Sequence, residues 1–208
     1  MKKIFVVLLA IAVLVSGCSI VFDGDNVDMD VALYEGSSGY SLNVPNTWVM
    51  DEETDNTVSF HSEDNQIAMS IVSELGGIDY YSMKEIKDQL TEELAAELFS
   101  SDYNVEEDSG GTKYFHRVLI GADQDGARIV VDMYANQPYV TIRHYIVIVA
   151  AASAYDTYES VIDDIISSFT VTMTEDEYLQ LMENRRDAAA DAQIEEEQTT
   201  EPVEEQTN

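Results

Sequence analysis

Apolar and polar residues alternate in several short runs along the chain, and this period of two predicts β-strands. The runs cover residues 31–34, 40–45, 58–60, 67–72, 113–120, 128–135 and 139–149, with a short final run at 170–172. Asp125-Gly126 predicts a hairpin turn between two of them. Asn136-Gln137-Pro138 predicts the turn that leads into the run 139–149. The pattern indicates a largely antiparallel sheet.

Other segments carry apolar residues at three- and four-residue steps, which predicts amphipathic helices. The first begins after Ser82, where Glu85 completes a capping box, and its apolar face is formed by Met83, Ile86, Leu90, Leu94 and Leu98. The second covers about 155–169, with Ser153 as the expected N-cap. A third helix with a thin apolar stripe is predicted over 174–193, where Thr174 and Glu177 form a second capping pattern.

The N-terminal residues have a different pattern, because Ile4 to Val15 is an unbroken apolar run after Lys2 and Lys3. A positive start, an apolar core and small residues at a cleavage site indicate a secretory signal peptide. Val15-Ser16-Gly17-Cys18 resembles the lipobox of bacterial lipoproteins. The resemblance implies cleavage between Gly17 and Cys18 and attachment of a diacylglycerol to Cys18, the single cysteine of the chain.

Two other interpretations of this segment are open. It could be an uncleaved transmembrane anchor, although Ser16 to Ser19 interrupt the run before the length of about 20 apolar residues that a membrane span needs. It could also be an ordinary signal peptide that contains a cysteine by chance. The order of charge, apolar run and lipobox favours a lipoprotein held on the extracytoplasmic face of the cell membrane.

These patterns divide the chain into five parts. Residues 1–17 are the expected signal peptide and 18–30 the lipidated cysteine with an acidic tether, which like charges extend. Residues 31–173 are the expected folded domain, of ordinary size for one core. The helix 174–193 follows, and 194–208 is acidic with almost no apolar side chains, so it is expected to be disordered.

The chain carries 41 acidic and 10 basic residues, a formal charge of −31. Loss of Lys2 and Lys3 with the signal peptide changes this charge to −33. Nucleic-acid binding and polybasic attraction to anionic lipids both depend on lysine and arginine, so the composition excludes both classes. Strong acidity suits a basic protein partner, and it also serves plain solvation, which is the commoner reason for it.

Catalytic and metal-binding patterns are absent from the sequence. His61, His116 and His144 fall in predicted strands, and those at 116 and 144 could be near neighbours in one sheet. Zinc needs three or four convergent ligands, and separate polar strand residues explain the histidines more simply. No nucleophile elbow, phosphate loop or calcium loop occurs. We therefore expect no cofactor and no metal. Tyr134, Tyr139 and Tyr145 gather in one predicted hairpin, as good strand formers or as an interaction surface.

Short phrases at both ends of the predicted domain resemble the PsbP-like family, whose bacterial members include DcrB-type lipoproteins. Gly39-Tyr-Ser-Leu-Asn-Val-Pro45 with Trp48 resembles its opening strand, and Ser167-Ser-Phe-Thr-Val171 its ending. The resemblance covers about 39–172 and implies an α+β fold, an α/β/α sandwich with a central antiparallel sheet flanked by helices. It also implies a non-enzymatic binding or assembly module of the cell envelope. An envelope hydrolase with paired carboxylates and a structural surface lipoprotein are the alternatives.

Overall fold

The computed structural model of the chain describes residues 29–76 and 82–199. The expected signal peptide, Cys18 and most of the tether lie outside these residues. The described chain forms two compact units, which meet in sequence between Thr172 and Met173. In chain order the elements are β1 (Val31–Gly36), β2 (Tyr40–Pro45), β3 (Val49–Glu53), β4 (Thr57–His61), β5 (Ile67–Leu75), α1 (Met83–Leu98), β6 (Asn104–Gly110), β7 (Tyr114–Ala122), β8 (Arg128–Tyr139), β9 (Ile142–Ala151), α2 (Ala152–Ser168), β10 (Thr170–Val171) and α3 (Glu175–Thr199).

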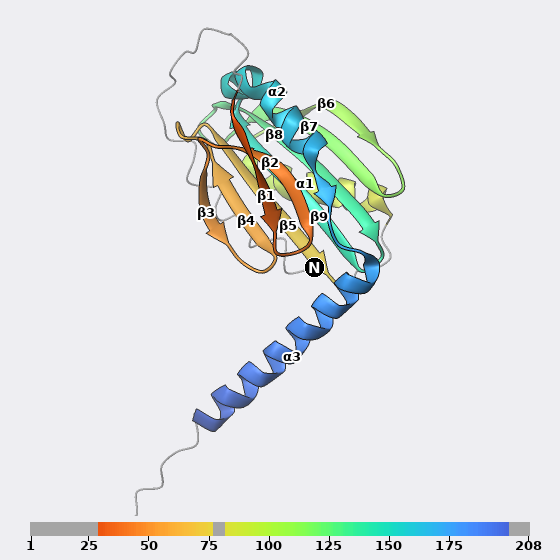
Figure 1. Cartoon of the computed structure of the whole chain (residues 1–208). Helices are drawn as coiled ribbons and strands as arrows, with labels where there is room; N and C mark the ends of the chain where they lie inside the picture. The colour runs from red at the N-terminus through yellow and green to blue at the C-terminus, as the bar shows by residue number, and fades with distance from the viewer. Residues whose placement is uncertain (1–28, 77–81, 200–208) are drawn as a thin grey trace, which may run out of the picture. The chain divides into compact units, whose positions relative to one another are not determined.

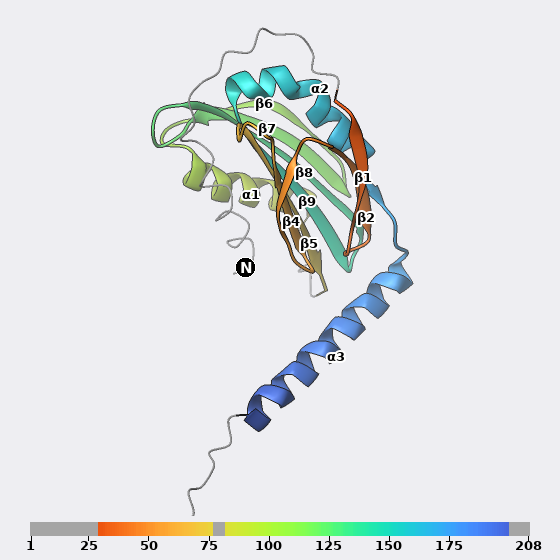
Figure 2. The same cartoon turned by 60° about the vertical axis from the view of Figure 1, so that its left-hand side comes forward.

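The first unit is built on a seven-stranded sheet with the order β3-β4-β5-β9-β8-β7-β6, in which every neighbouring pair is antiparallel. A second sheet, with the order β1-β2-β10, is also antiparallel. Helix α1 covers one face of the large sheet, and α2 with the small sheet covers the other (Figures 1 and 2). The fold is therefore α+β, with a central antiparallel sheet between helices.

The central strands explain this layering. Nine of the ten residues of β9 are buried, which is typical of a strand covered on both faces. Successive side chains point to opposite faces, so Tyr145, Val147 and Val149 pack in the core beneath α1. Ile146 and Ile148 pack in the core beneath α2 and the small sheet. One strand thus supplies two separate cores.

The two flanking helices differ in how they begin. Helix α1 starts with the predicted capping box, in which the Ser82 hydroxyl accepts from the Glu85 amide and the Glu85 carboxylate accepts from the Ser82 amide. The predicted N-cap of α2, Ser153, is wrong. Strand β9 remains paired through Ala151, which lies opposite Ile129, so α2 begins at Ala152 with no connecting loop and no side-chain cap.

Two edge strands and one turn also differ from expectation. Strands β3 and β6 have no buried residue, and polar composition is common for edge strands, so their sequences show no apolar alternation. The predicted turn at Asn136-Gln137-Pro138 is instead an irregularity within β8, where the register shifts between Asn136 and Tyr139. The chain turns at Val140-Thr141, between β8 and β9.

In the described chain, the second unit is formed by α3. The Thr174 hydroxyl accepts from the Glu177 amide, and the Glu177 carboxylate accepts from the Thr174 amide, as the capping pattern predicts. The helix continues to Thr199, so residues 194–199 of the expected disordered tail are helical. Residues 200–208 lie outside the described chain. Among the described residues no helix combines the length and the apolar character needed to cross a bilayer.

Candidate functional site

A surface pocket of about 300 Å³ lies beside the core beneath α2, and we call it the Trp48 pocket. Three segments that are distant in sequence line it: the chain around the small sheet, the β4–β5 turn and the first half of α2. The lining residues are Met29, Thr47, Trp48, Ser62, Glu63, Asp64 and Tyr158. The pocket therefore exists only because the fold brings the two sheets and α2 together.

The β4–β5 turn is held in one conformation by Ser62. The buried Ser62 hydroxyl donates to Asp64 Oδ1 at 2.6 Å and accepts from the backbone N–H groups of Gln66 and Ile67 at 3.2 and 3.0 Å. Asp64 Oδ1 also accepts from the Gln66 amide at 3.2 Å. Asn65 adopts a positive φ of 56°, which asparagine tolerates better than most residues. These contacts fix the Asp64 carboxylate through one of its oxygens.

Two polar atoms of pocket residues are buried without a hydrogen-bond partner among the described residues. They are Asp64 Oδ2, an acceptor, and Trp48 Nε1, a donor. Trp48 is only 7% exposed, and it follows β2 directly, with its amide donating to the Pro45 carbonyl. Buried polar atoms in native proteins are nearly always paired, and an unpaired one costs about 1–3 kcal/mol. Ser59 Oγ, Thr141 Oγ1 and Arg143 Nε are also buried without a partner, but the atoms of Trp48 and Asp64 belong to residues that line one pocket.

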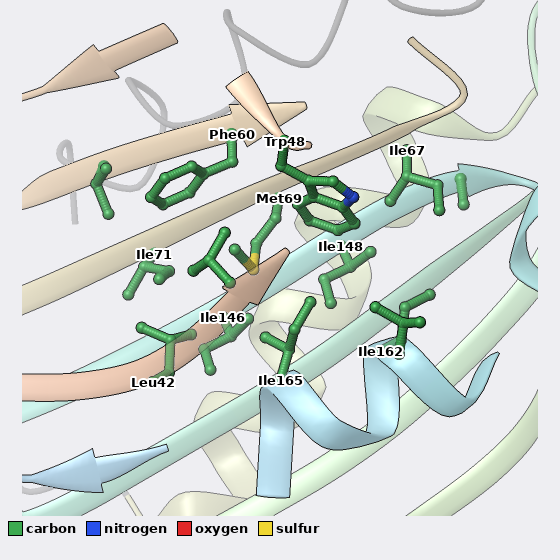
Figure 3. Close-up of a cluster of buried hydrophobic side chains, with 14 of the residues drawn as sticks. Leu42, Trp48, Phe60, Ile67, Met69, Ile71, Ile146, Ile148, Ile162 and Ile165 are labelled. Atoms are coloured by element: carbon green, nitrogen blue, oxygen red, sulfur yellow. The ribbon is translucent and has the colours of Figure 1, made fainter. Parts of the chain in front are cut away.

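Figure 3 shows how Trp48 is oriented in the core. Its ring lies among Met69, Ile148 and Ile67. The indole nitrogen is on the edge of the ring that is nearer to Ile67. The β4–β5 turn ends at Ile67, and Tyr158 lies one helical turn before Ile162. Trp48 lines the pocket together with residues of this turn and of α2. Its indole nitrogen is buried from solvent in the free protein.

The pocket is acidic. Glu63 is exposed, Asp64 is half-buried, and the described lining residues include no lysine, arginine or histidine. The pKa of the Tyr158 hydroxyl is raised above its ordinary value, first by burial and then by the negative charges of Asp64 and Glu63. Two carboxylates close enough to act on one phenol create a negative potential that favours a cation.

The three histidines occupy separate places. His61 Nδ1 lies 2.7 Å from Asp51 Oδ1 at the edge of the large sheet. His116 and His144 are not neighbours, because β8 lies between β7 and β9. Buried His144 pairs with the Ser73 hydroxyl at 2.9 Å and contacts the rings of Tyr40 and Phe169. In the described part of the chain, no three histidine, cysteine or acidic side chains gather as metal ligands would.

Asp132 is the centre of a buried polar link between α2 and the large sheet. Its side chain is fully buried, and it accepts from Tyr155 Oη at 2.8 Å and pairs with His116 Nε2 at 2.7 Å. The hydrogen bond to Asp132 raises the pKa of His116, which burial opposes, and Glu107 and Asp163 also raise it. Both Asp132 oxygens have partners, so this cluster holds α2 in place and offers no free group to a ligand.

A second buried network lies on the α1 side of the sheet. Arg143 is 4% exposed and donates to Glu74 Oε2 at 3.1 Å and to Tyr145 Oη at 2.9 Å, while the Tyr145 hydroxyl donates to the same Glu74 oxygen at 2.8 Å. Removing one partner of such a pair leaves a buried charge. The tyrosines expected to gather in one hairpin are divided, because Tyr134 packs in the core beneath α2 and Tyr145 in the core beneath α1.

Only weak signals in the sequence point to the Trp48 pocket. Trp48 is predicted to pack over the end of the strand 40–45, and Asp64-Asn65 is a common turn composition. No local pattern connects residues 48, 64 and 158, since only the tertiary fold joins them. Cys18, the expected lipidation site, and Gly17 lie outside the described residues, so lipidation stays a prediction.

Comparison with known proteins shows limited similarity. No protein family and no curated protein match the chain. Among solved structures, the chain is similar to cyanobacterial PsbP (CyanoP) from Synechocystis sp. PCC 6803, with a TM-score of 0.48, 15% identity and coverage of 76% of this chain and 98% of the other.

Two further solved structures are similar at a comparable level. One is a protein from Bacteroides thetaiotaomicron, with a TM-score of 0.44, 13% identity and coverage of 68% of this chain and 47% of the other. The second is a protein of unknown function and putative regulator from Pseudomonas aeruginosa, with a TM-score of 0.43, 8% identity and coverage of 69% and 99%. These values carry no information about function, which has to be argued from the site.

Replacing Ser62 with alanine tests how the β4–β5 turn is held. The Ile67 amide loses its acceptor in a buried position, so we expect Ser62→Ala to lower the free energy of unfolding by about 1–3 kcal/mol in urea denaturation. Ser59→Ala is a matched control, because the Ser59 hydroxyl is also buried but has no partner, and its removal should be nearly neutral. Equal losses in the two variants would contradict the role of Ser62.

The pKa values of His144 and His116 are shifted in opposite directions from the ordinary histidine value. Burial lowers the pKa of His144 to about 3. Below about pH 6.5 the unfolded chain therefore binds a proton at this residue that the native protein does not bind. As a result, the free energy of unfolding falls by about 1.4 kcal/mol per pH unit as the pH drops from 6.5 toward 3. His116 has a raised pKa. Its contribution to stability is therefore complete below about pH 6.5 and is lost as pH rises through the native pKa.

The measurement is a pH titration of the histidine ring resonances by NMR. We expect His116 to stay protonated above pH 6.5 and His144 to stay neutral well into the acid range. Asp132→Asn should lower the pKa of His116 and leave that of His144 unchanged, because only His116 bonds Asp132. An unchanged pKa of His116 in this variant would show that Asp132 does not set it.

Proposed function

We propose that the mature chain is a lipid-anchored, extracytoplasmic binding module of a bacterial cell envelope, and that it holds a partner in the Trp48 pocket without chemical turnover. The observation that carries this proposal is the pair of unpartnered buried atoms, Trp48 Nε1 and Asp64 Oδ2. A donor and an acceptor in one pocket are complementary to a polar ligand, and their pairing on binding recovers the cost of leaving them unpaired in the free protein.

The anchor supports the same proposal. The lipobox pattern at Val15 to Cys18 implies an acylated N-terminus, and two acyl chains are enough for stable membrane attachment. Ser19 to Asp30 can extend to about 40 Å, and Met29, at the end of this tether, lines the pocket. An acidic tether of this length presents the pocket well off the membrane, which suits a partner in the envelope outside it.

The acidic surface supports a protein partner with basic residues. A charge of −33 on the mature chain attracts cationic surfaces and repels phosphate backbones. Asp64, the acid with the defined geometry, already accepts hydrogen bonds from Ser62 and Gln66. A carboxylate held in this way is better suited to recognising a ligand than to acting as the acid or base of a hydrolase.

The function is tested in cells that express the full chain, as wild type, Cys18→Ala, Asp64→Asn or Glu92→Gln. Palmitate labelling should disappear only in Cys18→Ala, which should also leave the membrane fraction. Asp64→Asn should stay labelled but lose a crosslinked envelope partner that the wild type captures. Glu92→Gln removes the same charge from an exposed position of α1, on the other face of the sheet, and should retain the partner.

Three results would contradict the proposal. Palmitate labelling that persists in Cys18→Ala would remove the lipid anchor. Equal capture by Asp64→Asn and Glu92→Gln would remove the pocket as the binding site. Turnover of envelope glycans or peptides by the purified protein, lost in Asp64→Asn, would make the chain a hydrolase.

A further inference from the structure

The Trp48 pocket offers complementary groups that restrict what it can bind. Trp48 Nε1 can only donate and Asp64 Oδ2, when ionised, can only accept, and neither has a partner among the described residues. A ligand that pairs both atoms must carry an acceptor and a donor. Since both atoms are buried in the free protein, the ligand reaches them through a local opening of the pocket. A simple alkylammonium ion fails this requirement, because it has donors only.

The negative charge of the pocket restricts the class of ligand further. Glu63 and Asp64 lie side by side in the β4–β5 turn, and the described pocket lining contains no basic side chain. After burial, the same two carboxylates raise the pKa of the Tyr158 hydroxyl, as expected for a negative potential inside the pocket. The donor of the ligand is therefore best supplied by a cation, since hydrogen bonds between two charged groups are roughly twice as strong as neutral ones.

The shape and volume of the pocket favour a peptide ligand over a sugar. Sugar rings commonly stack on exposed aromatic faces, but Trp48 is 7% exposed and its ring packs in the core, so it offers no face for stacking. A volume of about 300 Å³ is at the lower limit of ligand pockets and suits one long side chain with its peptide group. Met29 and Tyr158 supply apolar surface for an aliphatic stem, which lysine and arginine bury while their charged ends stay paired.

We infer that the Trp48 pocket binds one lysine or arginine side chain of a protein partner, with the ammonium or guanidinium group on Asp64 and a backbone carbonyl of the same peptide accepting from Trp48 Nε1. This inference rests on the proposed binding function and adds the chemistry of the ligand. Glu63, at the rim, increases the local concentration of basic segments, while Asp64 and Trp48 determine which group is held.

The chain contains one tryptophan, so its indole N–H gives a single NMR resonance that reports on the pocket directly. The experiment uses the full mature chain with Cys18→Ala and titrates it with the peptide acetyl-Ala-Lys-Ala-amide. We expect a saturable shift of the indole resonance. Asp64→Asn should weaken binding about tenfold or more, as expected for loss of a charge-assisted hydrogen bond, whereas Glu92→Gln should leave the affinity within about twofold.

Three further probes separate the alternatives. Acetyl-Ala-norleucine-Ala-amide keeps the stem and the carbonyl but lacks the charge, and it should bind about tenfold more weakly or worse. Butylammonium lacks the carbonyl and should leave the indole resonance in place. N-acetylglucosamine tests a carbohydrate ligand and should not compete with the lysine peptide.

Equal affinity for the lysine and norleucine peptides, no indole shift with the lysine peptide, or competition by N-acetylglucosamine would each overturn the inference. The proposed function fails separately. If Asp64→Asn abolishes partner capture in cells while the lysine peptide does not bind, the binding function stands and the ligand class is wrong. If the peptide binds as expected but capture does not depend on Asp64, the ligand chemistry stands and the function is wrong.

Discussion

Burial of the central strands on both faces is the constraint on which the rest of this structure depends. Strands β5 and β9 pair over nine residues, from Ile67 opposite Ala150 to Leu75 opposite Ile142, and nearly all of β9 is buried. A sheet of this composition is stable in water only if both faces are covered. One cover is α1. The other is shared by α2 and the small β1-β2-β10 sheet, which meet over the core that contains Leu42, Ile148 and Ile165 (Figure 3).

The shared cover explains why the pocket occurs where it does. A single helix presents one continuous stripe, but α2 and the small sheet are different elements, and Trp48 lies on the connection from β2 to β3, between the two sheets. Its ring packs in the core, and the residue lines the pocket together with the β4–β5 turn. Ser62 fixes that turn and orients Asp64. The Trp48 side chain thus has two roles: its ring completes the core, and its N–H group is the proposed ligand donor.

Unpaired buried groups lower stability, and the same protein shows that its fold can avoid them. Both oxygens of the fully buried Asp132 have partners. Among the described residues, Ser59 Oγ, Thr141 Oγ1 and Arg143 Nε are buried without one. Local rules that are broken in one place while they are obeyed elsewhere tend to mark functional sites. The unpaired atoms of Trp48 and Asp64 differ from those three because both belong to residues that line one pocket.

The sequence predicted what local periodicity and capping determine. Helix α1, with its Ser82–Glu85 capping box, and the Asp125-Gly126 hairpin are as expected. Strands β3 and β6 were missed because an edge strand needs no apolar face, and Ser153 was wrong because the strand before α2 stays paired to Ala151. The pocket could not be predicted for a different reason. Trp48, Asp64 and Tyr158 are brought together by tertiary packing alone, and no local sequence pattern indicates that packing.

Binding in the Trp48 pocket depends on an indole N–H that is buried and has no acceptor among the described residues. Hydrogen exchange of this proton measures that claim most directly. We predict that it exchanges through local opening, much faster than the backbone amides of β9, which exchange only on global unfolding, and that saturating acetyl-Ala-Lys-Ala-amide slows it. An indole proton that exchanges as slowly as the β9 amides in the free protein would contradict the account.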